Sequence, residues 1–154
     1  IPDAPFLFPP GRPAMSRDPN CIFCKIVAGE IPSTRVLETD RAVVILDINP
    51  VVKGHVLIIP RDHYPQLRDL PDELAAHAGS LLPRLARAVV SAVRAEGSNV
   101  IINSGGVAGQ TIDHCHWHVI PRFDGDPVPW PHQAYSGDEM ARTASRITDL
   151  LDPA

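Results

Sequence analysis

The sequence predicts an α+β fold, in which helices pack against an antiparallel sheet. Segments with the apolar pattern of strands outnumber those with the pattern of helices, and short turns join most neighbouring strands. The chain of 154 residues suits one domain of ordinary size, and its 44% apolar content is sufficient for a packed core. We therefore expect a single domain over residues 15–154.

Residues 1–14 stand apart from this domain. They contain five prolines and no periodicity, and they lack the basic start and long apolar core of a signal peptide. Their composition predicts an extended arm, which is either a native extension or a remnant of cloning ahead of a native start at Met15.

The first half of the domain predicts one short helix and three strands. Asn20 can cap a helix that runs to about Ala28, where Gly29 would end it. Three apolar runs bounded by turn residues are expected to form strands: 36–38, 42–46 and 55–59.

The longest helix is expected to begin at Pro71, since proline and acidic residues are favourable in a first turn. Its apolar residues recur on one side at helical spacing: Leu74, Ala78, Leu81, Leu85, Ala88 and Ala92. Pro83 lies inside this pattern and should kink the helix or remove a backbone hydrogen bond. Gly97 is expected to end the helix.

Two further strands and a second helix follow. Residues 99–103 predict a strand, and a glycine-rich segment leads from it into a last strand that carries three histidines. Ser136 and Glu139 have the spacing of a capping box. The helix that they begin has an apolar stripe: Met140, Ala144, Ile147 and Leu151.

The three histidines of the last strand occupy alternating positions, at His114, His116 and His118. Successive side chains of a strand point to opposite faces, so the three rings would line one face at intervals of about 6.7 Å. Cys115 and Trp117 would then face a core. Because imidazole can act as nucleophile, acid, base or metal ligand near neutral pH, the row indicates a reactive patch rather than scattered surface histidines.

Composition excludes several classes of function. A net charge of −4 offers no general basic face for nucleic acid, and no apolar run approaches the length of a membrane span. Three cysteines are an odd number, and Cys21 and Cys24 form a Cys-x-x-Cys pair. This usage favours a reducing compartment with metal or thiol chemistry, so we expect a cytoplasmic protein.

The segment from Gly109 to Arg122, GQTIDHCHWHVIPR, resembles the signature of the histidine triad (HIT) superfamily. Residues 21–32 resemble the opening of prokaryotic members, and residues 46–50 and 54–63 resemble the central strands. The resemblance implies a five-stranded antiparallel sheet with one long helix, paired into a homodimer. Val89, Val90 and Val93 add apolar surface beside the stripe of the long helix, which suggests a second contact.

The resemblance also implies catalytic roles. His116 matches the nucleophile, which would attack the α-phosphorus of a nucleotide and form a transient nucleotidyl-imidazole. His55 would help to arrange the imidazole network, and His118 would face the phosphate oxygens. Thr111 would contact the leaving group.

Nucleotide contacts are implied for five more positions. These are Asp47 at the ribose hydroxyls, Ile48 against the base, and Asn103, Gly109 and Gln110, together with His118, near the phosphate. Without the family resemblance, ordinary turn and cap chemistry would explain the polar residues, and a flexible loop would explain the glycines.

A structural zinc site is implied at Cys21, Cys24, His63 and His114, where zinc-containing branches of the superfamily have their ligands. Four such ligands complete a tetrahedral site. The alternative is a pair of free thiols that pack a helix, with His63 on the surface. No catalytic metal is expected.

Three classes of function remain open at this point. The first is a nucleotide hydrolase or nucleotidyl transferase acting on purine nucleotide conjugates, either Hint-like on phosphoramidates or Fhit-like on dinucleoside polyphosphates. The second is a non-catalytic nucleotide-binding module, against which the intact triad argues. The third is a dithiol redox protein, which would need an exposed thiol of low pKa.

Overall fold

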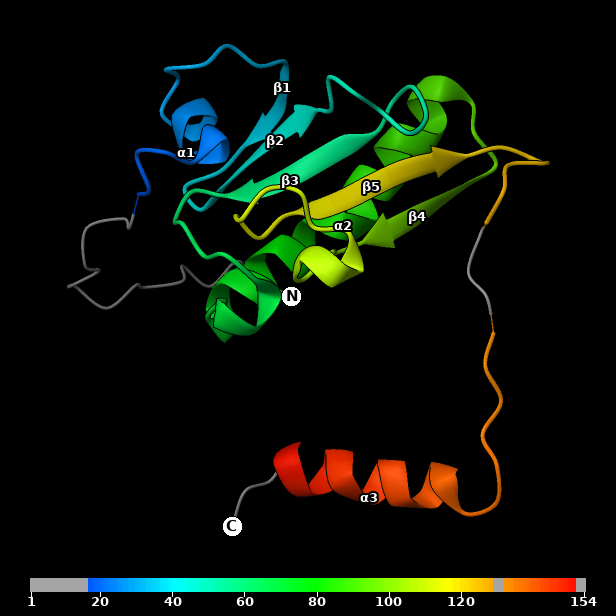
Figure 1. Cartoon of the computed structure of the whole chain (residues 1–154). Coiled ribbons are helices and arrows are strands. Elements are labelled where there is room, and N and C mark those ends of the chain that lie inside the picture. The colour runs from blue at the N-terminus through cyan, green and yellow to red at the C-terminus, as the bar shows by residue number, and fades with distance from the viewer. Residues whose placement is uncertain (1–16, 129–131, 152–154) are drawn as a thin grey trace, which may run out of the picture. The chain divides into compact units, whose positions relative to one another are not determined.

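The computed structural model describes residues 17–128 and 132–151 (Figure 1). The predicted proline-rich extension, residues 1–14, lies outside the described residues.

In the described residues, five strands form one antiparallel sheet in the order β1-β2-β3-β5-β4. The strands are β1 Arg35–Glu38, β2 Ala42–Leu46, β3 Val56–Pro60, β4 Gly97–Ile101 and β5 Trp117–Arg122. With helices packed against the sheet, this architecture confirms the predicted α+β class and the five strands that the resemblance implied.

The two faces of the sheet are covered by different helices. The long helix α2, Asp72–Val93, packs on one face (Figure 1), where its buried residues meet those of the sheet. The sheet contributes to this core Ala42, Val44, Val56, Ile58, Trp117 and Val119. Alternate side chains, such as Leu57 and Ile59, point to the other face and pack with the short helix α1, Ile22–Val27.

The alternation places His118 on the face of α1. Its neighbours Trp117 and Val119 belong to the α2 core, and His118 pairs across the ladder with Leu57, which packs with α1. Cys115 is also buried in the α2 core, as predicted.

The strand that carries the histidines begins later than predicted. β5 starts at Trp117, so His114 and His116 lie ahead of the ladder. The Cys115 N–H donates to the Tyr64 carbonyl at 2.6 Å, and the His114 N–H donates to the Ile112 carbonyl at 2.8 Å. These bonds hold the segment in a turn, which replaces the ladder there.

Two helix ends also differ from the prediction. Asn20 does not cap α1; Cys21 is the N-cap, and the Asn20 N–H instead donates to the Asp18 carboxylate at 2.8 Å. Gly97 does not end α2 but opens β4, because Arg94 already terminates the helix in the left-handed conformation, with φ 58° and ψ 37°. The Ala95 N–H then donates to the Val90 carbonyl at 2.9 Å, as in a Schellman motif.

Pro83 is accommodated inside α2, which runs without interruption over 22 residues. The proline has no N–H, so the carbonyl of Gly79, four residues earlier, loses its intrahelical donor. In the part of the chain that the structure describes, periodicity did not predict two 3-10 helices: Leu67–Asp69, which follows β3, and Gly106–Ala108, which lies between β4 and the triad.

The chain divides into two compact units, one ending at Asp124 and one beginning at Gly125. The second unit contains the predicted late helix, α3 Glu139–Leu151. The Glu139 carboxylate accepts a hydrogen bond from the Ser136 N–H at 3.1 Å, which is one half of the predicted capping box. Within the described residues, no helix is long and apolar enough to cross a membrane.

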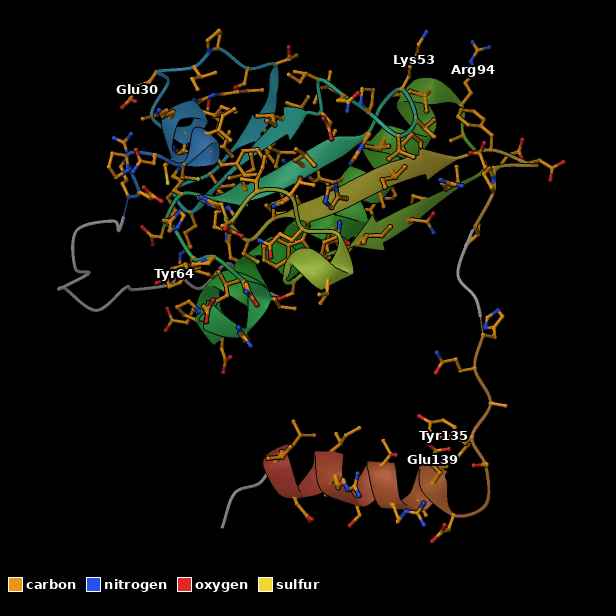
Figure 2. The ribbon with its side chains drawn as sticks, viewed as in Figure 1. Glu30, Lys53, Tyr64, Arg94, Tyr135 and Glu139 are labelled. Atoms are coloured by element: carbon orange, nitrogen blue, oxygen red, sulfur yellow. The ribbon has the colours of Figure 1, made fainter. Side chains whose placement is uncertain are left out.

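Replacing Arg94 by glycine should stabilise the protein. A left-handed conformation costs a residue with a Cβ about 1–2 kcal/mol, and glycine avoids this cost. Glycine also has greater conformational entropy in the unfolded chain, which offsets part of the gain. We therefore expect Arg94→Gly to raise the free energy of unfolding by roughly 0.5–1 kcal/mol. Figure 2 shows Arg94 projecting from the end of α2, and the side chain is exposed. Urea denaturation measures the change. Arg94→Ala is the matched control, because it removes the charge and keeps the Cβ; equal stability of the two variants would contradict the explanation.

Candidate active site

The centre of the site is His116, whose ring is fixed by the backbone of the residue two positions earlier. Its Nδ1 lies 2.6 Å from the carbonyl oxygen of His114, so Nδ1 carries the proton and donates it to that oxygen. The other ring nitrogen, Nε2, therefore keeps its lone pair. Burial lowers the pKa of His116, which is 4% exposed, so the ring is neutral and nucleophilic at neutral pH.

A second pair of imidazoles lies beside this ring. His55 Nε2 is 2.9 Å from His118 Nδ1, and the ring centroids of His116 and His118 are 4.8 Å apart. The Val51 N–H donates to His55 Nδ1 at 3.3 Å, so this nitrogen is an acceptor and His55 Nε2 carries the proton. His118 Nδ1 accepts that proton's hydrogen bond, which leaves the proton of neutral His118 on Nε2.

His118 Nε2 is thus a hydrogen-bond donor on a ring that lies beside His116. The atom is buried and has no hydrogen-bond partner among the described residues. Burial is the main cause that lowers the pKa of His118 to about 4, with further lowering by His116 and His55. A buried donor without a partner is costly, and an oxyanion of a bound ligand would satisfy it.

Asp47 lies beside His55, at the end of the row of imidazoles away from His116. Its Oδ2 is 3.5 Å from His55 Nδ1, and its Oδ1 accepts a hydrogen bond from the Asn49 N–H at 2.8 Å. The carboxylate raises the pKa of His55, but burial lowers it by more, so His55 is neutral and the Val51 amide is its hydrogen-bonding partner. Ile48, beside Asp47, is 94% exposed, which is unusual for a large apolar side chain.

Four predicted metal ligands, from segments far apart in the sequence, form one cluster. The potential ligand atoms of Cys21, Cys24, His63 and His114 all lie within 4.8 Å of one another. The two imidazole Nδ1 atoms are 3.3 Å apart, and the sulfur–nitrogen distances are 3.5 Å for Cys21–His114, 3.6 Å for Cys24–His114 and 3.4 Å for Cys24–His63.

These distances fit a zinc ion. With Zn–N bonds of about 2.0–2.1 Å and Zn–S bonds of about 2.3 Å, a tetrahedron has N–N edges of about 3.3 Å and N–S edges of about 3.6 Å. The tautomer of His114 also fits, because its Nε2 is 2.9 Å from the Pro60 carbonyl and donates to it, so Nδ1 presents a lone pair to the cluster. Burial raises the pKa of the Cys24 thiol, an effect that a bound cation would oppose.

His114 therefore belongs to both parts of the site. Its side chain faces the cluster and its carbonyl fixes the His116 ring. Phe23 of α1 packs edge-on against both rings, with centroid distances of 5.9 Å to His114 and 4.9 Å to His116. The cluster and the nucleophile are one connected structure.

The glycine-rich turn before the triad carries the remaining predicted residues. Thr111 is exposed. Asn103 is half-buried and lies two residues beyond the end of β4, whereas the sequence predicted a strand that extends to residue 103. Gly109 has φ +87°, a conformation that favours glycine. Gln110 differs from expectation: its side chain is buried and bonds to three backbone groups of the turn and its neighbours. Its direct phosphate contact stays a prediction.

Some groups that shape the site could not be predicted from the pattern of residue types in the sequence. The Val51 N–H and the Pro60 carbonyl act through the backbone, where residue type says little. Phe23 lies between the two cysteines, and that position is the one clue to its role. His77 is outside the site and bonds to the Thr39 hydroxyl at 2.9 Å.

Comparison with known sequences and structures identifies the family to which the chain belongs. A family model for the HIT domain matches residues 28–125. Adenosine 5′-monophosphoramidase HNT1 of Saccharomyces cerevisiae is 41% identical over 138 residues, which are 88% of this chain and 85% of the yeast protein. A crystal structure of a HIT family member from Bacillus subtilis has a TM-score of 0.81 at 38% identity, covering 88% of this chain and 99% of that chain.

A zinc-bound histidine triad family protein from Mycobacterium smegmatis is also similar. Its TM-score is 0.68 at 36% identity, covering 86% of this chain and 98% of that chain. The chain belongs to the HIT family, and it is an enzyme of that family.

Stability should depend on the neutral state of His118. Its pKa is lowered from 6.5 to about 4 in the folded chain, so below pH 6.5 the unfolded chain binds a proton that the folded chain does not. We expect the free energy of unfolding to fall as the pH is lowered from 6.5 towards 4. His118→Asn, which cannot titrate, should show a shallower fall when urea denaturation is repeated across this range. Parallel profiles of the two proteins would contradict the assignment.

Proposed function

We propose that this chain cleaves purine nucleotide conjugates at the α-phosphate through a covalent nucleotidyl-histidine at His116. The observation that carries the proposal is the hydrogen bond from His116 Nδ1 to the His114 carbonyl, which leaves a neutral Nε2 with a free lone pair. Hydrolysis and transfer to another acceptor would share this intermediate.

In the first step, the lone pair of His116 Nε2 forms a bond to phosphorus, and the bond to the leaving group breaks with its electron pair. An amine leaving group takes up a proton from solvent as it departs. The ring becomes cationic, and the His114 carbonyl stabilises it by accepting from Nδ1–H. In the second step, water attacks phosphorus, the P–N bond breaks back to His116, and the water proton passes to solvent. The product is a nucleoside monophosphate.

The other predicted residues would bind and orient the nucleotide. His118 Nε2–H would donate to a non-bridging phosphate oxygen, which would satisfy that buried donor. Gly109 would allow the backbone to approach the phosphate, with Asn103 beside it, and Thr111 would contact the leaving group. Asp47 would bind the ribose hydroxyls and Ile48 the base; the exposure of Ile48 supports a role in binding an apolar surface.

The phosphoramidate type of substrate is favoured by the relative named adenosine 5′-monophosphoramidase. The main alternative is a Fhit-like hydrolase of dinucleoside polyphosphates, which the run Gly109-Gln110-Thr111 also suits. The hydrolase names of similar proteins argue against the third possibility, a non-catalytic nucleotide-binding module.

We further propose that Cys21, Cys24, His63 and His114 hold one structural zinc ion. The edge lengths of the cluster and the His114 tautomer support this. When bound, the ion would stabilise the fold and neutralise two thiolates. We expect no divalent cation to be needed for the transfer itself, because the imidazoles of His116 and His118 would supply the nucleophile and a hydrogen-bond donor to the phosphate.

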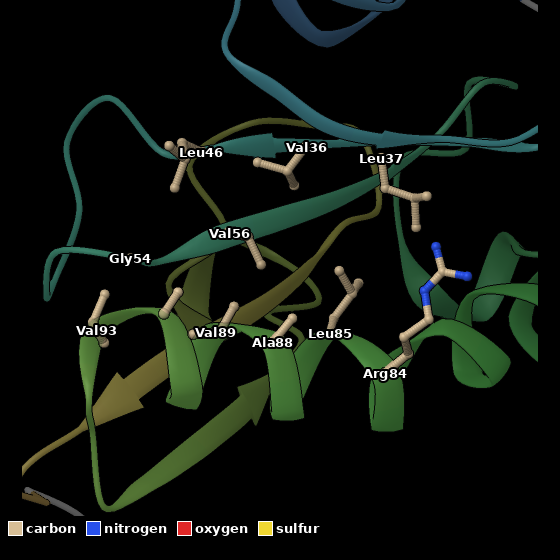
Figure 3. Close-up of a pocket in the computed structure, with 11 residues that line it drawn as sticks. Val36, Leu37, Leu46, Gly54, Val56, Arg84, Leu85, Ala88, Val89 and Val93 are labelled. Carbon is tan, nitrogen blue, oxygen red and sulfur yellow. The ribbon is translucent and has the colours of Figure 1, made fainter.

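A homodimer is the third part of the proposal. An open apolar groove of about 500 Å³ runs beside α2 (Figure 3). It is lined by Val36, Leu37, Leu46, Gly54, Val56, Arg84, Leu85, Ala88, Val89, Ala92 and Val93. Uncovered apolar surface of this extent supports contact with a second copy.

Light scattering should give about twice the chain mass of 16.7 kDa. Ala88→Glu places a charge in the groove and should lower the measured mass, whereas Arg87→Glu lies outside the groove lining and should not. A monomer mass for the unaltered protein at micromolar concentration would contradict the proposal.

His116→Ala should abolish turnover and leave nucleotide binding. A panel of nucleotide phosphoramidates, dinucleoside polyphosphates and nucleotide sugars identifies the substrate class, and calorimetry measures binding. We expect kcat to fall by a factor of about 10³ or more, since the covalent route is lost. Near-unaltered rates in the variant would refute the mechanism, and no turnover of any substrate by the unaltered enzyme would favour a binding module.

Loss of one cysteine should remove the metal. Metal analysis should find about one zinc per chain, and Cys21→Ser should lower both metal content and the melting temperature. Cys115→Ser is the control, because Cys115 is buried in the α2 core away from the cluster and its loss should lower stability alone. Full metal content in Cys21→Ser would rule out the assigned ligands.

A further inference from the structure

Gln110 occupies an unusual place for a polar residue. It lies in the glycine-rich turn before the triad, yet it is 7% exposed. Every polar hydrogen of its side chain is used within the chain. Nε2 donates to the Pro65 carbonyl at 2.6 Å and to the Ile112 carbonyl at 2.9 Å, and Oε1 accepts from the Gly105 N–H at 2.7 Å.

These three bonds join three segments of backbone. Gly105 begins the glycine-rich turn, Pro65 lies in the loop after β3, and Ile112 leads into the triad. The main-chain N–H of Gln110 also donates to the Gly105 carbonyl at 3.3 Å. The side chain thus replaces secondary structure where the ladder has not yet begun.

A short series of hydrogen bonds leads from this amide to the nucleophile. The Ile112 carbonyl accepts from Gln110 Nε2 and also from the His114 N–H, at 2.8 Å. The carbonyl of His114 then accepts from His116 Nδ1. The orientation of the nucleophilic ring therefore depends on a backbone turn that Gln110 holds.

The second donor hydrogen of Gln110 binds the segment that also holds the peptide group between His114 and Cys115. The peptide plane that contains the His114 carbonyl also contains the Cys115 N–H, which donates to the Tyr64 carbonyl at 2.6 Å. Tyr64 directly precedes Pro65, whose carbonyl Gln110 binds. Gln110 thus bonds to both segments between which this peptide plane is held.

We infer that Gln110 is a positioning residue: its amide holds the His114 peptide group in the orientation that fixes the proton on His116 Nδ1. The effect on the reaction rests on the proposed function, whereas the effect on the ring does not. A direct phosphate contact needs a donor, and both amide hydrogens of Gln110 are already engaged with carbonyls.

The chemistry of the position requires an amide. Glutamate has a similar shape and can still accept from Gly105, but as a carboxylate it has no donor and would face two carbonyl oxygens. Methionine has similar length and neither donor nor strong acceptor, so it would leave three backbone groups without this partner. Gln110→Glu therefore removes the two donated hydrogen bonds, and Gln110→Met removes all three hydrogen bonds of the side chain.

The test compares Gln110→Met and Gln110→Glu with Gln133→Met, a glutamine that is exposed in the second unit. Nitrogen-15 NMR of the histidine rings reports which nitrogen of His116 carries the proton. We expect the Nδ1–H tautomer in the unaltered protein and in Gln133→Met, and a mixture of tautomers in both Gln110 variants. With the substrate found by the panel, kcat should fall about 10- to 100-fold while KM changes less than about threefold.

A folded Gln110 variant that keeps the Nδ1–H tautomer and a kcat within about twofold of the unaltered enzyme would overturn the inference. So would a raised KM with unaltered kcat, which would indicate direct nucleotide contact. If Gln110→Met fails to fold, the tautomer of His116 in Gln110→Glu decides. A second measurement uses the unaltered protein, in which both side-chain amide protons of Gln110 should exchange slowly with solvent. Fast exchange of these protons would refute the hydrogen bonds on which the inference rests. Absence of nucleotide turnover would refute the proposed function alone, since the tautomer comparison needs no substrate.

Discussion

The site depends on the complete hydrogen bonding of one buried residue. His114 is fully buried, and a buried imidazole or carbonyl is costly unless each polar atom has a partner. Its Nε2–H donates to Pro60 on β3, its Nδ1 faces the sulfur and imidazole cluster, and its carbonyl accepts from His116. One residue therefore fixes the tautomer of the nucleophile and joins α1, β3 and the triad, so neither the cluster nor the nucleophile can be rearranged alone.

The sheet separates two kinds of interior. The face under α2 is apolar, and Trp117 and Val119 pack there. The opposite face carries His118 beside the neutral imidazoles of His116 and His55. Burial on this face keeps the rings uncharged, which a nucleophile and a directed donor both require. The rigid apolar layer thus supports a polar layer whose protons are fixed by hydrogen bonds.

Much of this arrangement follows from sequence pattern, and the rest depends on particular backbone bonds. Alternation places Cys115 and Trp117 in the core, and the apolar run at 42–46 forms the strand expected of it. The late start of β5 was not predictable, because the Tyr64 and Ile112 carbonyls capture the amides that a ladder would have used. Arg94 ends α2 in a conformation that statistics assign to glycine. The role inferred for Gln110 depends on backbone groups of Gly105, Pro65 and Ile112, whose side chains carry no signal of that contact.

The central claim is that His116 forms a covalent bond to phosphorus through the nitrogen that its hydrogen bond leaves free. The stereochemistry at phosphorus tests this most directly, with a substrate whose α-phosphorus is made chiral by a sulfur and an oxygen isotope. Two in-line displacements, first by His116 and then by water, predict net retention of configuration. Net inversion would show that water attacks the substrate directly, and it would contradict the account.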